Sequence, residues 1–143
     1  MRVILDSNVL ISALIATGSP PDLIYRAWRH KRFTLVTSTA QLRELRRASR
    51  YPKLQKLVPP SEFGALINRL HGALVLDELP RIDVSRDSAD NYLLAMAVSA
   101  EAEFLVTGDA KDLLRLKKFG STRIRDGSRF SVERMTVAGH VRP

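Results

Sequence analysis

Residues 1–15 read MRVILDSNVLISALI, and the rest of the predicted fold is built around this segment. Val3–Leu5 is a short, unbroken apolar run, which is typical of a strand buried on both faces. After the polar residues Asp6–Asn8, apolar side chains recur at helical spacing through Val9–Leu14. The stretch therefore predicts a buried strand that runs directly into a helix.

Asp6 stands at the junction between that strand and that helix. Open α/β sheets bind their ligands beyond the carboxyl ends of the strands, so this carboxylate is a candidate ligand-binding group. Asp is also a favoured helix N-cap, as are Ser and Asn, which follow at positions 7 and 8. The stretch alone leaves both roles of Asp6 open.

The composition indicates one ordinary globular domain. The chain has 143 residues, 45% of them hydrophobic and 27% charged, and we expect a single domain over residues 1–135 followed by a C-terminal tail over 136–143. The sequence has no cysteine, which excludes disulfides, thiolate zinc sites and a cysteine nucleophile. No apolar run approaches the roughly 20 residues that span a bilayer, and the N-terminus lacks signal-peptide features. We therefore expect a cytoplasmic protein without a membrane partner.

The net charge is the most informative bulk property. A total of 23 Lys and Arg against 15 Asp and Glu gives +8, which favours a polyanionic partner such as nucleic acid. Several acids nevertheless stand at the ends of predicted elements. This contrast fits a phosphodiester-handling metal site in a basic cleft.

Strands and helices alternate along the rest of the chain. Apolar runs predict strands near 33–36, 73–76 and 103–107, and apolar periodicity predicts helices near 21–30, 38–49 and 61–71. A short helix from residue 113, an edge strand at 122–125 and a terminal helix at 130–135 complete the pattern. The alternation favours an α/β domain with a mostly parallel sheet.

The helix near 38–49 has a basic face. At about 100° per residue, four arginines fall within one arc and Glu44 lies at the border of the apolar side. Glu44 either turns into a crevice or forms an i,i+3 pair with Arg47 on a solvated surface. With two following lysines, the arginines form the expected phosphate-contacting surface: Arg43, Arg46, Arg47, Arg50, Lys53 and Lys56.

Asp90 is the acid whose spacing is most informative. Asp87 and Asp90 resemble a capping box with Asp in place of the usual Glu, which is one interpretation of both. However, Asp90, Leu93 and Ala97 follow i, i+3, i+7 spacing, which turns Asp90 toward the core. A buried carboxylate is costly, so Asp90 must be capped, paired or bound to a cation.

Four acids are expected to converge at one end of the sheet. Asp6 and Asp109 both follow strands, while Glu44 and Asp90 lie in the first turns of helices. Mg²⁺ prefers carboxylate oxygens and water, and a paired metal site can activate water for phosphodiester hydrolysis. The chemistry suits hard divalent ions.

Four segments of the sequence form a recognisable set: VILDSNVLISAL, TSTAQLRELRR, RDSADNYLLAMA and FLVTGDAKDLL. Together they resemble a PIN domain, similar to the VapC-type ribonuclease toxins of toxin–antitoxin pairs. The resemblance runs from Arg2 to about Phe130. It implies a three-layer α/β/α fold and a Mg²⁺- or Mn²⁺-dependent endoribonuclease that acts on RNA, is dimeric or a higher homo-oligomer, and is restrained by an antitoxin protein.

The resemblance also implies roles for individual residues. The family's metal-binding acids correspond to Asp6, Glu44, Asp90 and Asp109, and these are the residues we expect to carry catalysis. Ser7 stands where the family has Thr or Ser and orients a carboxylate or water, and Asn8 braces the turn. Asp87 and Asp112 are supporting candidates. Asn91 replaces a second Asp of many relatives, which leaves open whether Asp87 or Asp90 contacts the metal.

Two other functions fit the same residues. The first is a PIN-type nuclease of RNA processing or of DNA flaps, which would use the same acids. The second is a non-catalytic nucleic-acid-binding module in which the acids are only caps and buried pairs. Binding of Mn²⁺ separates the second from a nuclease, because caps do not bind the ion.

Overall fold

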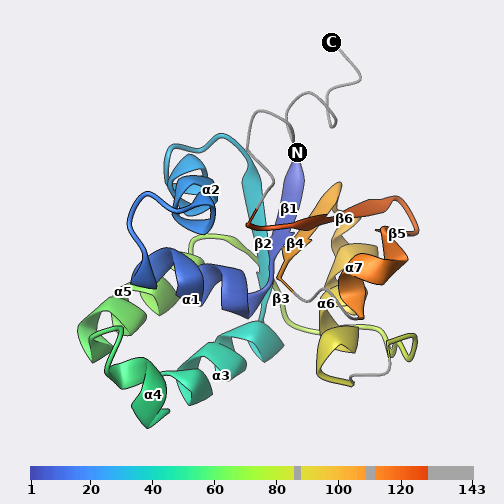
Figure 1. The fold of residues 1–143 in the computed structure, drawn as a ribbon. Coiled ribbons are helices and arrows are strands. Elements are labelled where there is room, and N and C mark those ends of the chain that lie inside the picture. Colours follow the sequence, from blue (N-terminus) through green and yellow to red (C-terminus); the bar gives the residue numbers. More distant parts are fainter. Residues whose placement is uncertain (86–87, 109–111, 129–143) are drawn as a thin grey trace.

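The computed structural model describes residues 1–85, 88–108 and 112–128 (Figure 1). Asp87, Asp109, the helix expected at 130–135 and the tail expected at 136–143 lie outside the described residues. Among the described residues, no helix combines the length and the apolar character needed to cross a membrane.

A mixed sheet forms the centre of the fold. Its described strands lie in the order β3-β2-β1-β4-β6-β5. Their bounds are β1 Arg2–Leu5, β2 Thr34–Ser38, β3 Leu74–Leu76, β4 Phe104–Thr107, β5 Lys118–Phe119 and β6 Thr122–Asp126. All neighbours pair in parallel except β5 and β6, which are antiparallel. The expected mostly parallel sheet is confirmed.

Helices cover both faces of this sheet (Figure 1). They are α1 Ser7–Ile15, α2 Pro20–Arg29, α3 Thr39–Ala48, α4 Pro52–Gln55, α5 Pro60–Leu70, α6 Ser88–Ala100 and α7 Leu113–Leu116. Alternate residues of β1 divide the core, because successive side chains of a strand point to opposite faces. Val3 and Leu5 pack with α1, α2, α3 and α5, whereas Ile4 packs with α6 and Leu113. The three-layer α/β/α fold is therefore confirmed.

The expected edge position of residues 122–125 is wrong. Strand β6 pairs with β4 on one side and with β5 on the other, so β5 is the strand at this edge. Gly120 has a φ of 58°, a left-handed conformation that favours glycine, and lets the chain reverse between Phe119 and Thr122. The reversal adds a strand too short to show apolar periodicity.

Candidate active site

Asp6 lies at the carboxyl end of β1, where it caps helix α1 and lines a cavity. Its Oδ1 accepts a 3.3 Å hydrogen bond from the backbone N–H of Asn8, which makes Asp6 the N-cap of α1. Its Oδ2 accepts a 2.7 Å hydrogen bond from the hydroxyl of Thr107 at the end of neighbouring β4. The carboxylate is thus fixed from two elements while it lines a cavity.

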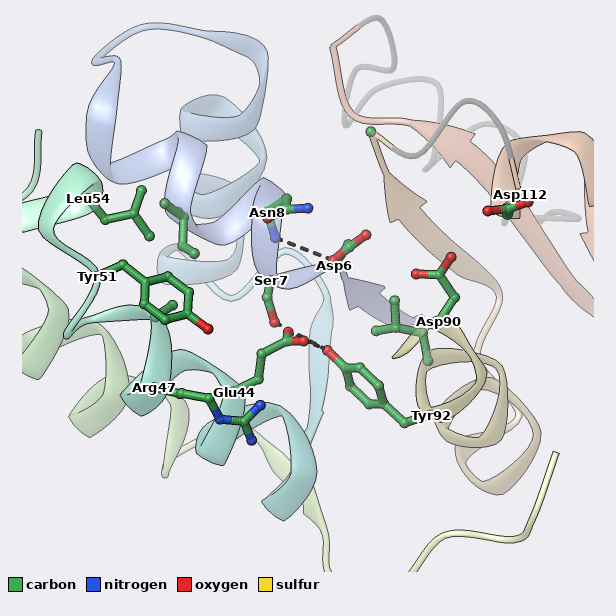
Figure 2. A pocket seen from close by; sticks show the side chains of 14 residues that line it. Asp6, Ser7, Asn8, Glu44, Arg47, Tyr51, Leu54, Asp90, Tyr92 and Asp112 are labelled. Atoms are coloured by element: carbon green, nitrogen blue, oxygen red, sulfur yellow. Dashed lines mark hydrogen bonds between the residues drawn. The ribbon is translucent and has the colours of Figure 1, made fainter. Parts of the chain in front are cut away.

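That cavity has a volume of about 720 Å³ and lies at the carboxyl ends of β1 and β4 (Figure 2). Four acids from different elements line it: Asp6, Glu44, Asp90 and Asp112. Parallel neighbours such as β1 and β4 end at the same edge of the sheet, which explains how residues distant in sequence meet here. The predicted convergence is confirmed for Asp6, Glu44 and Asp90.

Glu44 turns into this crevice. Its Oε1 accepts a 2.7 Å hydrogen bond from the hydroxyl of Tyr92 on α6 (Figure 2). Among the residues that the structure describes, no ion pair joins Glu44 to Arg47. Of the two alternatives for Glu44, the structure therefore supports a side chain that turns into the crevice over a surface pair with Arg47.

A chain of hydrogen bonds supports Tyr92. A phenol has one proton, and Tyr92 donates it to Glu44, so the 3.3 Å contact with Ser7 has the Ser7 hydroxyl as donor. Ser7 in turn accepts a 3.4 Å hydrogen bond from Nε2 of Gln41. Gln41 is held by two 2.7 Å hydrogen bonds, donated to the carbonyl of Leu5 and accepted from the hydroxyl of Thr37. The orientation of the Gln41 amide is therefore fixed by its partners.

Burial raises the pKa of the Tyr92 phenol far above its ordinary value. The hydrogen bond from Ser7 lowers this pKa, whereas the negative charges of Glu44 and Asp6 raise it further. The phenol therefore stays protonated, and remains a hydrogen-bond donor to Glu44, at alkaline pH values where an ordinary tyrosine would ionise.

Asp90 lies in the first turn of α6 and faces the cavity (Figure 2). The neighbouring Asn91 is buried and has a structural role: its Oδ1 accepts from the backbone N–H groups of Val84 and Ser85 at 3.1 and 2.8 Å. Its Nδ2 donates to the carbonyl of Ser85 at 3.3 Å, which a carboxylate could not do. Asn91 thus anchors the connection before α6.

Comparisons with known proteins agree with this arrangement. The family model of the PIN domain matches residues 2–111. The chain belongs to the PIN-domain family. The uncharacterized protein MJ1680 of Methanocaldococcus jannaschii is 29% identical over 119 residues, covering 82% of this chain and 76% of MJ1680. PIN domains are generally nucleases that use divalent metal ions.

A solved structure shares the PIN fold. The crystal structure of VapBC2 from Rickettsia felis, bound to a DNA fragment from its promoter, superposes with a TM-score of 0.54. The match has 18% sequence identity and covers 88% of this chain and 98% of that chain. The expected PIN-domain fold is therefore confirmed.

The donors in the cavity suit the metal ions that PIN domains use. Carboxylate oxygens of Asp6 and Asp90 face one space, and Mg²⁺ is commonly held by one or two carboxylates together with water and substrate phosphates. Within residues 1–85, 88–108 and 112–128, no three His, Asp or Glu side chains gather closely enough to hold an ion by themselves. Asp109, the remaining predicted ligand, and Asp87 lie outside the described residues.

The basic surface predicted for this PIN domain is exposed. Arg47 also lines the cavity, on the α3 side where Glu44 lies. All the residues predicted for this surface are exposed to solvent: Arg43, Arg46, Arg47, Arg50, Lys53 and Lys56. Through Arg47, this basic surface reaches the acidic cavity.

Sequence reasoning missed three polar residues that organise the site. Gln41 shares i, i+4, i+7 spacing with Leu45 and Ala48, which places a polar side chain on the buried face of the helix. Because buried polar groups are normally hydrogen-bonded, this position could have indicated a structural role for Gln41. Tyr92 immediately follows the acidic start of α6, and Thr107 ends β4, but neither has a distinctive spacing. Their roles depend on which elements pack together.

Proposed function

We propose that this PIN domain is a Mg²⁺- or Mn²⁺-dependent endoribonuclease that hydrolyses RNA phosphodiester bonds and is the toxin of a toxin–antitoxin pair. One observation carries the proposal: Asp6, Glu44 and Asp90, from three separate elements, line one cavity at the carboxyl edge of the sheet. An arginine-rich helix borders that cavity, and the net charge is +8. Acidic side chains inside the cavity and basic side chains next to it suit a metal-dependent reaction on a polyanion.

Asp6, Asp90, Asp109 and Glu44 are the residues proposed to hold the ion. A bound divalent ion lowers the pKa of its water and stabilises negative charge on phosphate oxygens. The protein fixes the acids beforehand: Thr107 and the backbone of Asn8 orient Asp6, and Tyr92 orients Glu44. Such fixed geometry lowers the cost of reaching the transition state, because little rearrangement is needed.

Substrate binding is assigned to the exposed basic residues around α3. Their charges contact backbone phosphates, which gives affinity without sequence preference and with strong salt dependence. Arg47 is the member of this group that also lines the cavity, so it is placed to bind a phosphate near the acids. Ser7 supports the site through its hydrogen bond with Tyr92.

The toxin role rests on the likeness to VapBC2 and implies a partner. We further propose that this chain acts in the cytoplasm as a homodimer or higher homo-oligomer and is restrained by a cognate antitoxin. Expression of the chain alone is then expected to stop bacterial growth, and the product of a neighbouring gene is expected to relieve the arrest. Growth that continues at full rate despite active nuclease would favour RNA processing instead.

Replacement of Asp6 tests the nuclease. Asp6→Asn is expected to reduce the rate of RNA cleavage with Mg²⁺ by more than about 100-fold, since even groups that only support a metal ligand are worth about 10- to 100-fold. Glu62→Gln is the matched control, because Glu62 is an exposed acid on α5 and does not line the cavity. Unchanged cleavage by Asp6→Asn would refute the assignment.

Calorimetric titration with Mn²⁺ separates the nuclease from a non-catalytic module. The wild-type chain is expected to bind the ion and Asp6→Asn to bind it more weakly. A DNA oligonucleotide of the same sequence as the RNA is expected to be a poor substrate. Equal cleavage of DNA would contradict the specificity for RNA but not the nuclease.

A further inference from the structure

Tyr51 is a large aromatic side chain at the rim of the acidic cavity. It is 50% exposed, so it contributes little to the core, yet it lines the same cavity as Asp6 and Glu44. Figure 2 shows Tyr51 across the cavity from Asp90. An exposed aromatic ring in this position is available to a ligand.

The backbone of Tyr51 is held on both sides. Its N–H donates to the carbonyl of Ala48 at 3.0 Å, at the end of α3. Its carbonyl accepts from the N–H groups of Leu54 and Gln55, both at 3.0 Å, at the start of α4. Pro52 follows and restricts Tyr51 to extended backbone, with φ −73° and ψ 125°. The ring is therefore attached to a backbone that is already ordered, which lowers the entropy cost of ligand binding.

The groups beside Tyr51 in the cavity divide into two kinds. Ile11 and Leu54 add apolar surface to the cavity that Tyr51 lines, and Arg47 adds a guanidinium. A nucleotide has the complementary parts, namely an aromatic base and a phosphate. The acids deeper in the cavity would then face the neighbouring phosphodiester.

We propose that Tyr51 is a stacking platform for one unpaired nucleobase of single-stranded RNA, and that Arg47 binds the adjoining phosphate. The inference rests on the proposed nuclease function and narrows its substrate class. Bases in an RNA duplex are stacked on one another and paired, so they cannot lie on the ring of Tyr51. Single-stranded RNA is selected for this reason.

A segment of an antitoxin protein is the alternative occupant of this cavity, because a peptide also has apolar and polar parts. The net charge of +8 and the exposed arginines next to Tyr51 in sequence favour a polyanion over a peptide that must fill an apolar groove. The location of Tyr51 in the cavity of the acids favours the substrate.

Binding is measured in the full chain with Asp6→Asn, so that RNA stays intact, by fluorescence anisotropy with a short single-stranded RNA of mixed sequence. Adding Tyr51→Ala is expected to weaken this binding by about 5- to 150-fold, the range that loss of one base–aromatic stack produces. Tyr51→Phe, which keeps the ring, is expected to bind as before. Leu57→Ala is the matched control, since Leu57 is 59% exposed and does not line the cavity.

Abasic RNAs, each lacking one base, locate the contact. One abasic position is expected to weaken binding to the protein with Tyr51, but not to the protein with Tyr51→Ala, because both changes remove the same stack. In the cleavage-competent chain, Tyr51→Ala is expected to raise KM more than it lowers kcat. A duplex of the same sequence is expected to bind equally with and without the ring.

Three results would overturn the inference. If Tyr51→Ala leaves RNA binding unchanged while the wild-type chain cleaves RNA, the platform is wrong and the nuclease stands. If Tyr51→Ala weakens only the binding of the antitoxin, Tyr51 is a protein contact. If the wild-type chain neither binds nor cleaves RNA, the proposed function fails and the platform fails with it.

Discussion

The hydroxyl of Tyr92 donates a 2.7 Å hydrogen bond to Oε1 of Glu44 and thereby joins helix α6 to helix α3. These helices belong to different layers, because α3 packs on the face of the sheet with Leu5 and α6 packs on the face with Ile4. The bond spans the end of the sheet where the acids gather. It couples the position of Glu44 to the packing of the opposite layer.

Removal of the Tyr92 hydroxyl is expected to affect activity more than stability. Tyr92→Phe should lower kcat for RNA cleavage by about 10-fold or more, as loss of groups that orient metal ligands does. The lost hydrogen bond should cost about 1 kcal/mol of the free energy of unfolding. Tyr25→Phe is the matched control, because the Tyr25 hydroxyl accepts a 3.1 Å bond from Arg69 outside the cavity. Equal kcat values for both variants would show that Tyr92 has no positioning role.

The raised pKa of Tyr92 predicts how stability depends on pH. In the unfolded chain tyrosine ionises near pH 10, whereas burial keeps the folded phenol protonated to higher pH. The folded state therefore holds one more proton above about pH 10, and the free energy of unfolding falls there by up to about 1.4 kcal/mol per pH unit. Denaturant unfolding of Tyr92→Phe should lack this part of the slope. Parallel curves for the two proteins between about pH 9 and pH 11, the range in which an ordinary tyrosine ionises, would contradict this prediction.

Thr107 is expected to tune the affinity for the metal through Asp6. Its hydroxyl donates to Oδ2 of Asp6 at 2.7 Å, so Thr107→Val removes one of the hydrogen bonds that orient the carboxylate. The Kd for Mn²⁺ should rise by about 10- to 100-fold, measured by calorimetry. Thr122→Val provides the comparison, since the Thr122 hydroxyl is equally buried but donates to the carbonyl of Ala102. The same Kd for the wild type and for Thr107→Val would show that Thr107 has no role in metal binding.

Gln41 is expected to matter for folding as well as for the site. Gln41→Met keeps the volume but leaves the carbonyl of Leu5 and the hydroxyl of Thr37 without the partners they have now. Each buried polar group left unsatisfied costs about 1–3 kcal/mol, so the free energy of unfolding should fall by at least about 2 kcal/mol. Adding Thr37→Val should recover part of this loss, because one unsatisfied hydroxyl disappears. A fully additive loss in the double variant would refute the coupling.

The fold was largely predictable because its signals are local. The apolar run of Val3–Leu5 predicted β1. Because β1 and β4 pair in parallel, Asp6 then lies beside the end of β4. The two-residue strand β5 was not predictable, because neither apolar alternation nor length distinguishes Lys118–Phe119 from a loop. The edge position expected for β6 was wrong as a result.

The partners inside the site were less predictable than its acids. Acids at element ends carry a signal in their position, whereas the bond from Tyr92 to Glu44 depends on how two layers pack around the sheet. Asn91 illustrates the same limit, since its role became evident only through the backbone groups of Val84 and Ser85 that it binds. Residue types predicted the chemistry, and tertiary packing determined the connections.

Arg47 is expected to contribute a phosphate contact that salt weakens. Arg47→Ala should reduce the affinity for single-stranded RNA at low salt and make the slope of log K against log salt concentration shallower by about 0.7, the value for one phosphate contact on a single strand. Arg29→Ala is the control, because Arg29 is exposed on α2, lies 5.9 Å from the centre of the Trp28 ring and does not line the cavity. Anisotropy titrations across salt concentrations measure both slopes. Equal shifts for the two variants would mean that the net charge of +8, and not the position of Arg47 beside Glu44, governs RNA binding.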